Sequence, residues 1–256
     1  QTVYGGPEGD LWELVMGEQI HIGGFQSSMD LAERAGIGPG MRGVDFCCCN
    51  GAGVRFLLRF RNVDRMHGVD ATPHVLERSR FRCSEQGYDG RADFVLADVC
   101  RTGLPSQSFD FVWGEDAWCY VSDKPALIRE ASRLVKPGGT IAFTDWVEGS
   151  VALSDAEAQR FLRFMKFPNI LGIPEYTQLL RDNSFEVTTA EDTRRFPPYV
   201  DLYLQMLGMQ LTIDALRIIG FDMSLMKAMH EEMAFMQQLA HAGKIAQGLF
   251  IARRIP

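Results

Sequence analysis

Acidic residues follow short apolar runs at regular intervals in the first half of this chain. They are Asp45, Asp70, Asp98 and the pair Glu115-Asp116, each at or near the end of a predicted strand. Open α/β sheets bind ligands at the carboxyl ends of their strands, so these acids would face one ligand. A carboxylate can accept hydrogen bonds from both hydroxyls of a ribose. Asp70 follows Asp45 by about 25 residues, which is near the spacing at which nucleotide-binding α/β domains place a ribose-binding acid. Acids at strand ends also cap helices, so any single one could be structural, but four in succession favour a binding edge.

Small residues surround the first of these acids. Residues 44–53 read Val-Asp-Phe-Cys-Cys-Cys-Asn-Gly-Ala-Gly, and an apolar helical run follows at 54–60. This order predicts strand, tight loop and helix, with the loop backbone and the helix N-terminus close to a nucleotide. Cys47 and Cys49 stand where glycines are expected, so each must turn away from the ligand or contact it directly.

The six cysteines do not predict a disulfide framework or a metal site. Three of them are adjacent, and no CxxC pair suggests zinc, so reduced thiols and no metal are expected. A covalent role for Cys47 is an alternative.

Strand and helix signals alternate through most of the chain. A threonine followed by proline at 72–73 and a capping box formed by Ser154 and Glu157 mark two helix starts. The alternation predicts an α/β domain with a mostly parallel sheet. Strands are expected at 44–46, 66–70, 92–97, 109–113, 140–144, 185–187 and 248–255, and helices near 27–35, 54–60, 74–83, 123–135 and 154–165.

Two segments outside this alternation are expected to cover the site. Residues 1–40 are acidic and aromatic and form either a lid or a simple packing helix. Residues 198–242 are rich in Met and Leu at helical spacing, which is typical of an adaptable core and could also cap a pocket.

Composition excludes several classes of function. The chain has 256 residues and a formal net charge of -7, without the clustered Lys and Arg that a nucleic-acid surface needs. No apolar run has membrane-spanning length and no signal-peptide pattern is present, so a cytoplasmic protein without membrane contact is expected.

Together these motifs resemble the class I S-adenosylmethionine-dependent methyltransferases. Asp45-x-Cys47-x-Cys49-x-Gly51 occupies the family's D-x-G-x-G-x-G loop, Gly68-Val69-Asp70 its ribose acid, and Ala97-Asp98-Val99 its adenine-side motif. The strings at 109–112 and 134–139 match the fourth strand and the turn into the fifth. The resemblance implies a Rossmann-like seven-stranded sheet, mostly parallel, with helices on both faces and an antiparallel last strand. It also implies an N-terminal arm at 1–40 and a methyltransferase domain at 41–256, in which residues 198–242 cap the acceptor.

Within this class the chain is similar to the glycine, sarcosine and dimethylglycine N-methyltransferases. The strings at 17–23, 113–117, 143–145 and 242–248 support this subgroup. Tyr120 replaces a frequent histidine and Gln247 a frequent aromatic residue. The resemblance implies S-adenosylmethionine as cofactor, S-adenosylhomocysteine as product, and a small-molecule amine as methyl acceptor.

The resemblance and the strand ends together nominate site residues. The expected cofactor-binding residues are Asp45, Cys47, Cys49, Gly51, Asp70, Ala71, Thr72, Asp98, Val99 and Glu115. The expected acceptor-binding residues are Asp116, Trp118, Tyr120, Trp146, Tyr176, Tyr203 and Arg195. Aromatic faces attract methylammonium groups, and an arginine can bind a substrate carboxylate. His21 and Tyr120 are the candidate general bases.

Other functions remain open at this stage. The acceptor atom could be oxygen or sulfur of a small metabolite or natural product, or the domain could bind S-adenosylmethionine without turnover. A nicotinamide oxidoreductase is disfavoured because the G-x-G-x-x-G fingerprint is missing from the first loop. The oligomeric state is open, with a homodimer as one alternative.

Overall fold

The computed structural model describes residues 7–209 and 211–255. Residues 1–6 of the predicted arm, Gln210 of the predicted insertion and Pro256 lie outside the described residues. None of the described helices is long and apolar enough to cross a membrane.

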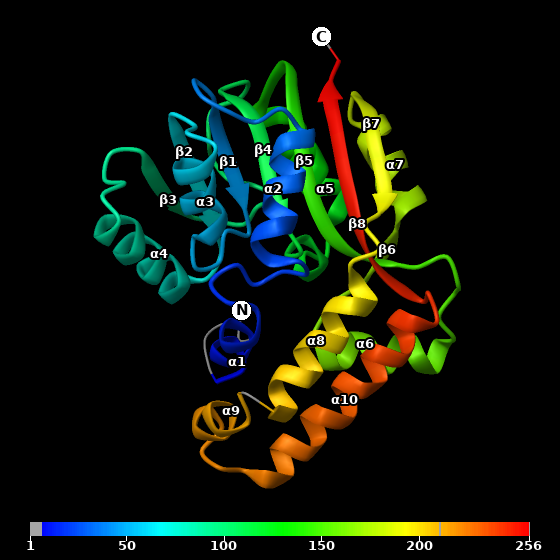
Figure 1. Ribbon diagram of the computed structural model, residues 1–256. Coiled ribbons are helices and arrows are strands. Elements are labelled where there is room, and N and C mark those ends of the chain that lie inside the picture. The colour runs from blue at the N-terminus through cyan, green and yellow to red at the C-terminus, as the bar shows by residue number, and fades with distance from the viewer. Residues whose placement is uncertain (1–6, 210, 256) are drawn as a thin grey trace.

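One sheet runs through the molecule (Figure 1). Its strands are β1 Arg42–Phe46, β2 Arg65–Asp70, β3 Ala92–Leu96, β4 Phe109–Glu115, β5 Val135–Glu148, β6 Leu171–Gly172, β7 Phe185–Asp192 and β8 Ile245–Arg254. Within the described residues the order is β3-β2-β1-β4-β5-β8-β7, and the two-residue β6 pairs with β5. β8 runs antiparallel to both β5 and β7, whereas the neighbouring pairs from β3 to β5 are parallel. This confirms the predicted Rossmann-like, mostly parallel sheet with an antiparallel last strand, and the short β6 adds an eighth strand, within the described residues, to the seven that were expected.

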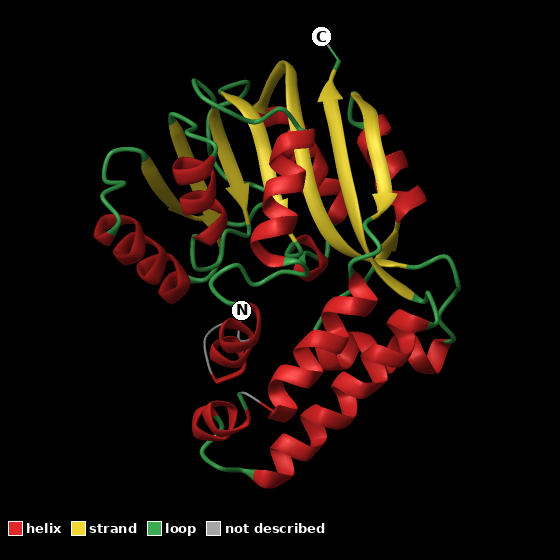
Figure 2. Ribbon diagram, in the orientation of Figure 1, coloured by secondary structure: helices red, strands yellow, loops and turns green. Residues whose placement is uncertain are grey.

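Helices cover both faces of the sheet and extend below it (Figure 2). Apolar residues of α2, α3 and α4 pack on one face, and those of α5 and α7 on the other. A third core joins α1, α6, α8 and α10 beyond the carboxyl end of the sheet, as a helical cap. The bounds are α1 Pro7–Met16, α2 Gly24–Arg34, α3 Ala52–Phe60, α4 Pro73–Glu85, η2 Trp118–Tyr120, α5 Lys124–Leu134, α6 Asp155–Met165, α7 Ile173–Asp182, α8 Phe196–Met209, α9 Thr212–Ile218 and α10 Met223–His241.

Local signals set several helix ends. The Ser154 hydroxyl and the Glu157 side chain form the predicted capping box of α6. The Asp123 carboxylate accepts a hydrogen bond from Ala126 N at the start of α5. Thr72 stands at the N-cap of α4 with proline in the first turn, but its side chain makes no cap bond.

The observed strands differ most in length from the predicted ones where they pair with strands distant in the sequence. β5 extends to Glu148 and β8 begins at Ile245, beyond the predicted 144 and 248, because the two strands pair along this whole length. β7 reaches Asp192 for the same reason, through its pairing with β8. The 198–242 stretch forms three helices, with a break around Gly220, where φ is +66°. Met233 and Met236 are buried as an adaptable core requires, whereas Met209 and Met223 are exposed.

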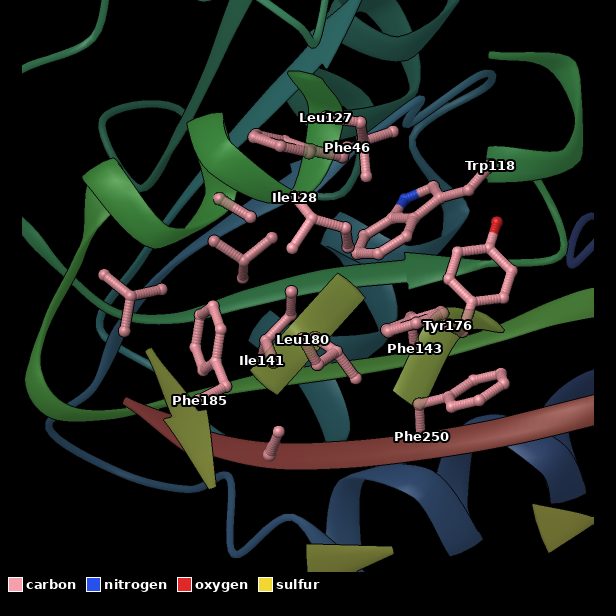
Figure 3. Packing of buried hydrophobic residues seen from close by; sticks show 14 of the residues in the cluster. Phe46, Trp118, Leu127, Ile128, Ile141, Phe143, Tyr176, Leu180, Phe185 and Phe250 are labelled. Carbon is pink, nitrogen blue, oxygen red and sulfur yellow. The ribbon is translucent and has the colours of Figure 1, made fainter. Parts of the chain in front are cut away.

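A stack of aromatic rings fixes the core between the sheet and α5 and α7 (Figure 3). The Trp118 ring lies on Phe143 with centroids 4.1 Å apart, and Phe143 lies on Phe250 at 4.6 Å. Tyr176 contacts the Phe143 ring edge to face at 5.3 Å. Burying each such ring contributes roughly 2–3 kcal/mol, so η2, β5, β8 and α7 are held firmly beside the site.

Candidate active site

A cavity of about 450 Å³ opens at the carboxyl ends of β1, β2 and β4, a volume typical of a small-molecule or cofactor site. Residues 18–21 of the N-terminal arm, a segment we call the strap, form part of its wall. The other lining residues are Asp45, Cys47, Cys48, Cys49, Asn50, Ala52, Gly53, Asp70, Ala71, Thr72, Asp98, Val99, Cys100, Glu115, Asp116, Ala117, Tyr120, Val121, Ser122 and Asp123.

The first loop adopts a glycine-like backbone although it carries cysteines. φ is +59° at Cys47 and +44° at Cys49, so both residues occupy the left-handed region at a cost of about 1–3 kcal/mol each. Two hydrogen bonds offset part of this cost. Cys49 N donates to Asp70 Oδ2 at 3.1 Å, and Ser79 Oγ donates to Cys49 O at 2.7 Å. Asp70 and the first loop therefore form one hydrogen-bonded unit.

The thiols of Cys47 and Cys49 are partly buried and are favoured in the protonated form. Burial raises the pKa of Cys47 well above its ordinary value, and the carboxylates of Asp70 and Asp45 raise it further. Burial together with Asp70 raises the pKa of Cys49 to about 12. Because a thiolate is the nucleophilic form, the structure does not support a covalent role for Cys47.

Asp45 lies almost fully buried against the start of α3. Burial raises its pKa well above the usual value, and the charges of Glu115 and Asp70 add to the effect. A Cβ placed on Gly53 would lie only 2.7 Å from Asp45 Oδ2. Gly53 is therefore needed for the close approach of the helix to this carboxylate.

Glu115 and Asp116, at the end of β4, are tied to the N-terminal part of the chain. Ser28 Oγ donates to Glu115 Oε1 at 2.8 Å, and Trp113 Nε1 donates to Oε2 at 3.1 Å. Ile22 N donates to Asp116 Oδ2 at 2.8 Å. Burial raises the pKa of Glu115 to about 7 and that of Asp116 to about 6. Asp116 also has a φ of +48°, the kind of backbone strain that clusters at functional sites.

Gln247 of β8 completes the attachment of the arm. Its Nε2 donates to Ile22 O at 2.9 Å and to Asp116 Oδ2 at 2.8 Å, and its Oε1 accepts from Thr193 Oγ1 at 2.9 Å. The side chain is fully buried. Gln247 is therefore a polar link between the arm and Asp116.

A smaller second pocket adjoins the cavity. The two share Ile20, His21, Asp116 and Tyr120. The second pocket has room for about 10 Å³, so it must open before it admits more than a water-sized group. Its remaining walls are apolar or aromatic, from Trp12, Met16, Trp146 and Met165.

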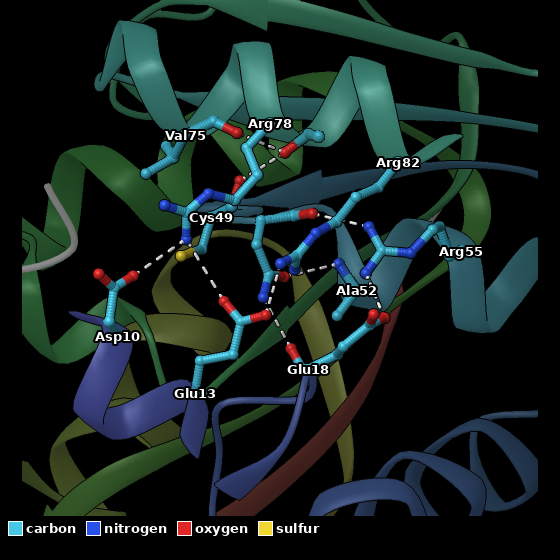
Figure 4. A network of polar contacts seen from close by, with 11 residues as sticks. Asp10, Glu13, Glu18, Cys49, Ala52, Arg55, Val75, Arg78 and Arg82 are labelled. Atoms are coloured by element: carbon cyan, nitrogen blue, oxygen red, sulfur yellow. Dashed lines mark hydrogen bonds and ion pairs between the residues drawn. The ribbon is translucent and has the colours of Figure 1, made fainter. Parts of the chain in front are cut away.

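Ion pairs hold α1 and the strap against the sheet domain (Figure 4). Glu13 contacts Arg82 at 2.5 Å and Arg78 at 3.4 Å. Glu18 contacts Arg55 at 2.8 Å, and Arg55 Nη1 also donates to the carbonyl oxygen of Asn50 in the first loop at 2.7 Å. The arm therefore lies over both pockets and is fastened to α3 and α4, as a lid would be.

The cavity wall is strongly acidic. None of its described lining residues is a lysine or an arginine. The acidic side chains of the wall are Glu18, Asp45, Asp70, Asp98, Glu115, Asp116 and Asp123. Such a wall favours cations and the hydroxyls of a sugar, which suits a ribose-containing sulfonium ligand.

The structure separates the nominated residues into two groups. Of the cofactor-binding set, Gly51 alone does not line the cavity; it is the N-cap of α3 with a φ of +75° and packs on Ser79. Of the acceptor set, Asp116, Tyr120 and Trp146 line the second pocket together with His21.

The other four nominated acceptor residues lie elsewhere, so their assignment is corrected. Trp118 is fully buried in the core, where the absence of a side chain at Gly114 makes room for its ring. Tyr176 is also in the core and donates from its hydroxyl to Asp145 at 2.6 Å. Tyr203 is buried in the cap core, and Arg195 pairs with Asp30 at 2.7 Å.

Several site residues were not nominated from the sequence. Gly53 belongs to the small-residue loop and Trp12 to the aromatic arm, so both had a signal that could have found them. Met16, Asn50 and Met165 had none, because their positions depend on how α1, the first loop and α6 pack. The described residues contain no group of three or more His, Cys, Asp or Glu side chains arranged to hold a metal ion.

Comparisons with known proteins agree with this geometry. The sequence family described as "Methyltransferase domain" matches residues 44–143, which contain the first loop and all four acidic strand ends. The fold and this match together support a class I S-adenosylmethionine-dependent methyltransferase domain.

Individual relatives are distant. Phosphoethanolamine N-methyltransferase 1 of Arabidopsis thaliana is 25% identical over 78% of this chain, which spans only 39% of that relative's length. The 27-O-demethylrifamycin SV methyltransferase of Amycolatopsis mediterranei is 28% identical over 73% of this chain and 74% of its own length. A solved structure, a putative sarcosine dimethylglycine methyltransferase from Galdieria sulphuraria, superposes with a TM-score of 0.85 over 97% of both chains at 18% identity.

Proposed function

We propose that this chain transfers a methyl group from S-adenosylmethionine to the nitrogen of a small amine. The observation that carries the proposal is the second pocket, which opens onto the cavity through His21, Asp116 and Tyr120. An aromatic wall with one carboxylate and one histidine suits an amine that is cationic in solution and neutral when it attacks.

The residues of the cavity fit the cofactor. Asp70 is suited to the ribose hydroxyls, and Asp98 with Val99 to the adenine side, while Asp45 and Glu115 favour the cationic end. When bound, S-adenosylmethionine supplies a methyl group on a sulfonium, which an aligned lone pair can displace. Alignment and exclusion of water are then the main tasks of the protein.

The chain's own residues divide these tasks. Asp116 lies at the junction of the pockets and can orient the amine by a charge-assisted hydrogen bond. Trp12 and Trp146 can hold its alkyl groups. The strap and α1 close over both pockets and keep water away, which requires the lid to open for each acceptor.

The electrostatics favour some amines over others. Arg195, which was expected to bind a substrate carboxylate, is paired with Asp30 and lines neither pocket. Glycine and sarcosine would therefore bring an unmatched carboxylate into an acidic site. We expect amines with a neutral tail to be better acceptors than these amino acids.

A second candidate is methyl transfer to oxygen of a natural product. The likeness to the rifamycin methyltransferase, which extends over 74% of that protein, favours it. Binding of S-adenosylmethionine without turnover is a third outcome, which the strained cysteine loop keeps open. A cytoplasmic location and a homodimer stay predictions from the sequence.

The test is a methyl-transfer screen over amines, amino acids, phenols and thiols, with the modified atom identified by product mass. Small amines should be methylated, and Trp146→Ala should raise their KM by about tenfold, the loss of one cation–π contact. Trp118→Phe is the control, since it changes the core and should leave KM unchanged. Activity on phenols alone would replace the amine proposal with the second candidate.

A further inference from the structure

Three polar side chains from distant parts of the chain meet beside the junction of the two pockets. His21 Nε2 lies 3.1 Å from Ser28 Oγ and 3.3 Å from Glu115 Oε1. Ser28 Oγ donates to the same Glu115 oxygen at 2.8 Å. All three side chains are buried, and Ser28 is fully inaccessible.

The other ring nitrogen of His21 is the unusual feature. Nδ1 is buried and has no hydrogen-bond partner among the described residues, although His21 lines both pockets. Buried polar atoms are normally paired, because leaving one unpaired costs about 1–3 kcal/mol. Nδ1 is therefore a candidate partner for a ligand, which would reach it when the second pocket opens.

The hydrogen bonds select the tautomer of His21. The hydroxyl proton of Ser28 is donated to the Glu115 carboxylate, so Ser28 Oγ is free to accept a proton donor from His21. Nε2 then carries the hydrogen and Nδ1 carries the lone pair. The unpaired nitrogen is the basic one.

We propose that Ser28 and Glu115 form a proton relay that carries the acceptor's ammonium proton away from His21. The proposal rests on the proposed N-methyltransferase function and adds the route by which the amine becomes nucleophilic. His21 contacts the acceptor; Ser28 and Glu115 act through His21 as positioning and relay groups.

The proton balance of the relay is complete. The N–H bond of the acceptor ammonium breaks, its electron pair stays on the amine nitrogen, and the proton bonds to His21 Nδ1. The Nε2 proton passes to Ser28 Oγ, and the Ser28 hydroxyl proton passes to Glu115 Oε1. The amine is then neutral, His21 is neutral in its other tautomer, and Glu115 is a carboxylic acid.

The acid–base properties of the groups support this transfer. Burial lowers the pKa of His21. The Asp116 carboxylate and the Ile22 backbone oppose this effect, and the charge of Arg195 adds to it. Burial raises the pKa of Glu115 to about 7, so the end of the relay can hold a proton near neutral pH. Glu115 is therefore suited to be the final proton acceptor of the relay near neutral pH.

The first experiment compares Ser28→Ala with Ser27→Ala. Ser27 is the matched control, because it is equally buried on α2 and its hydroxyl has no partner among the described residues. Each variant is assayed on an amine that is protonated at the assay pH and on an aniline, which is not. Ser28→Ala should lower kcat on the protonated amine by about 100-fold, the lower end of general-base contributions, and change kcat on the aniline little. Ser27→Ala should match the parent protein on both.

The second experiment reads the relay without turnover. ¹⁵N NMR of histidine-labelled protein should show His21 as the Nε2–H tautomer in the parent and as a mixture in Ser28→Ala. Glu115→Gln, which cannot take up a proton, should remove the acid limb of the kcat profile near pH 7. S-adenosylhomocysteine binding, followed by thermal shift, confirms that each variant is folded.

The outcomes separate the relay from the proposed function. Methylation of amines by the parent, with Ser28→Ala equally impaired on the protonated amine and the aniline, would overturn the relay alone. An unchanged tautomer in Ser28→Ala would also overturn it. Failure of the parent to methylate any amine while it binds S-adenosylhomocysteine would overturn the proposed function instead.

Discussion

Replacing Gln247 with leucine should loosen the attachment of Ile22, the residue that follows the strap, to the β8 strand and to Asp116. Leucine has a similar size but removes every hydrogen bond of this fully buried side chain. The carbonyl of Ile22, the carboxylate of Asp116 and the hydroxyl of Thr193 each lose a partner that lies between 2.8 and 2.9 Å away.

The size of the effect follows from those three groups. A buried polar group without a partner costs about 1–3 kcal/mol, and Asp116 keeps its bond from Ile22 N, so the total should be about 4 kcal/mol. Asp116 should also become harder to ionise, because it loses an amide donor. The strap would be held less firmly, and S-adenosylhomocysteine should bind at least tenfold more weakly.

The assay is urea unfolding together with calorimetric titration of S-adenosylhomocysteine. Gln237→Leu is the control, since Gln237 also donates to an aspartate, Asp201, at 2.6 Å, but at a partly buried site of α10. It should cost less than about 1 kcal/mol and leave the affinity unchanged. If Gln247→Leu behaved like Gln237→Leu, the strap would not depend on this glutamine and the reasoning would fail.

Three further predictions concern pH, the core and the loop. Burial raises the pKa of Glu115 in the folded protein from 4.5 to about 7. The protonated form of Glu115 therefore stabilises the ligand-free protein fully below pH 4.5, and this contribution is lost as the pH rises through 7. The loss amounts to at most about 3 kcal/mol. Urea midpoints from pH 4.5 to 8 should show a decline, to which Asp116 and Asp45 also contribute because burial raises their pKa values. Glu115→Gln should make the decline smaller by the share of Glu115, and an unchanged slope would mean that Glu115 is ionised in the folded protein. Trp118→Ala should lower the free energy of unfolding by about 3–5 kcal/mol. A change in acceptor KM without a loss of stability would instead mean that Trp118 contacts the acceptor. Cys47→Gly and Cys49→Gly should change the free energy of unfolding by less than about 1 kcal/mol, because relief of the positive φ offsets the lost burial of the thiol. Each variant should alter the affinity for S-adenosylmethionine. Unchanged affinity in both variants would mean that the thiols do not contact the cofactor.

The acidic strand ends and the order of elements could be predicted from the chain alone. Strand runs, caps such as Ser154 with Glu157, and turn residues act over a few neighbours, so their signals are local. Parallel alternation then places Asp45, Asp70 and Glu115 at one edge, because parallel strands share the same direction.

Local sequence signals could not distinguish the aromatic residues that line the proposed acceptor pocket from those that pack in the core. Trp118 and Trp146 lie near the carboxyl ends of neighbouring strands and have the same chemistry, yet one packs in the core and the other lines the second pocket. Their difference depends on Gly114, whose missing side chain leaves room for the Trp118 ring.

The sequence by itself thus determined the class of fold and the strand edge at which the acidic residues gather. Only the tertiary structure decided how the arm closes the site, because the contact of Gln247 with Ile22 joins residues 225 positions apart, and the pairing of Glu13 with Arg82 joins residues 69 apart. Such contacts leave no local pattern, since each partner is an ordinary polar residue within its own segment. Their energy arises when folding removes both groups from water and brings them together.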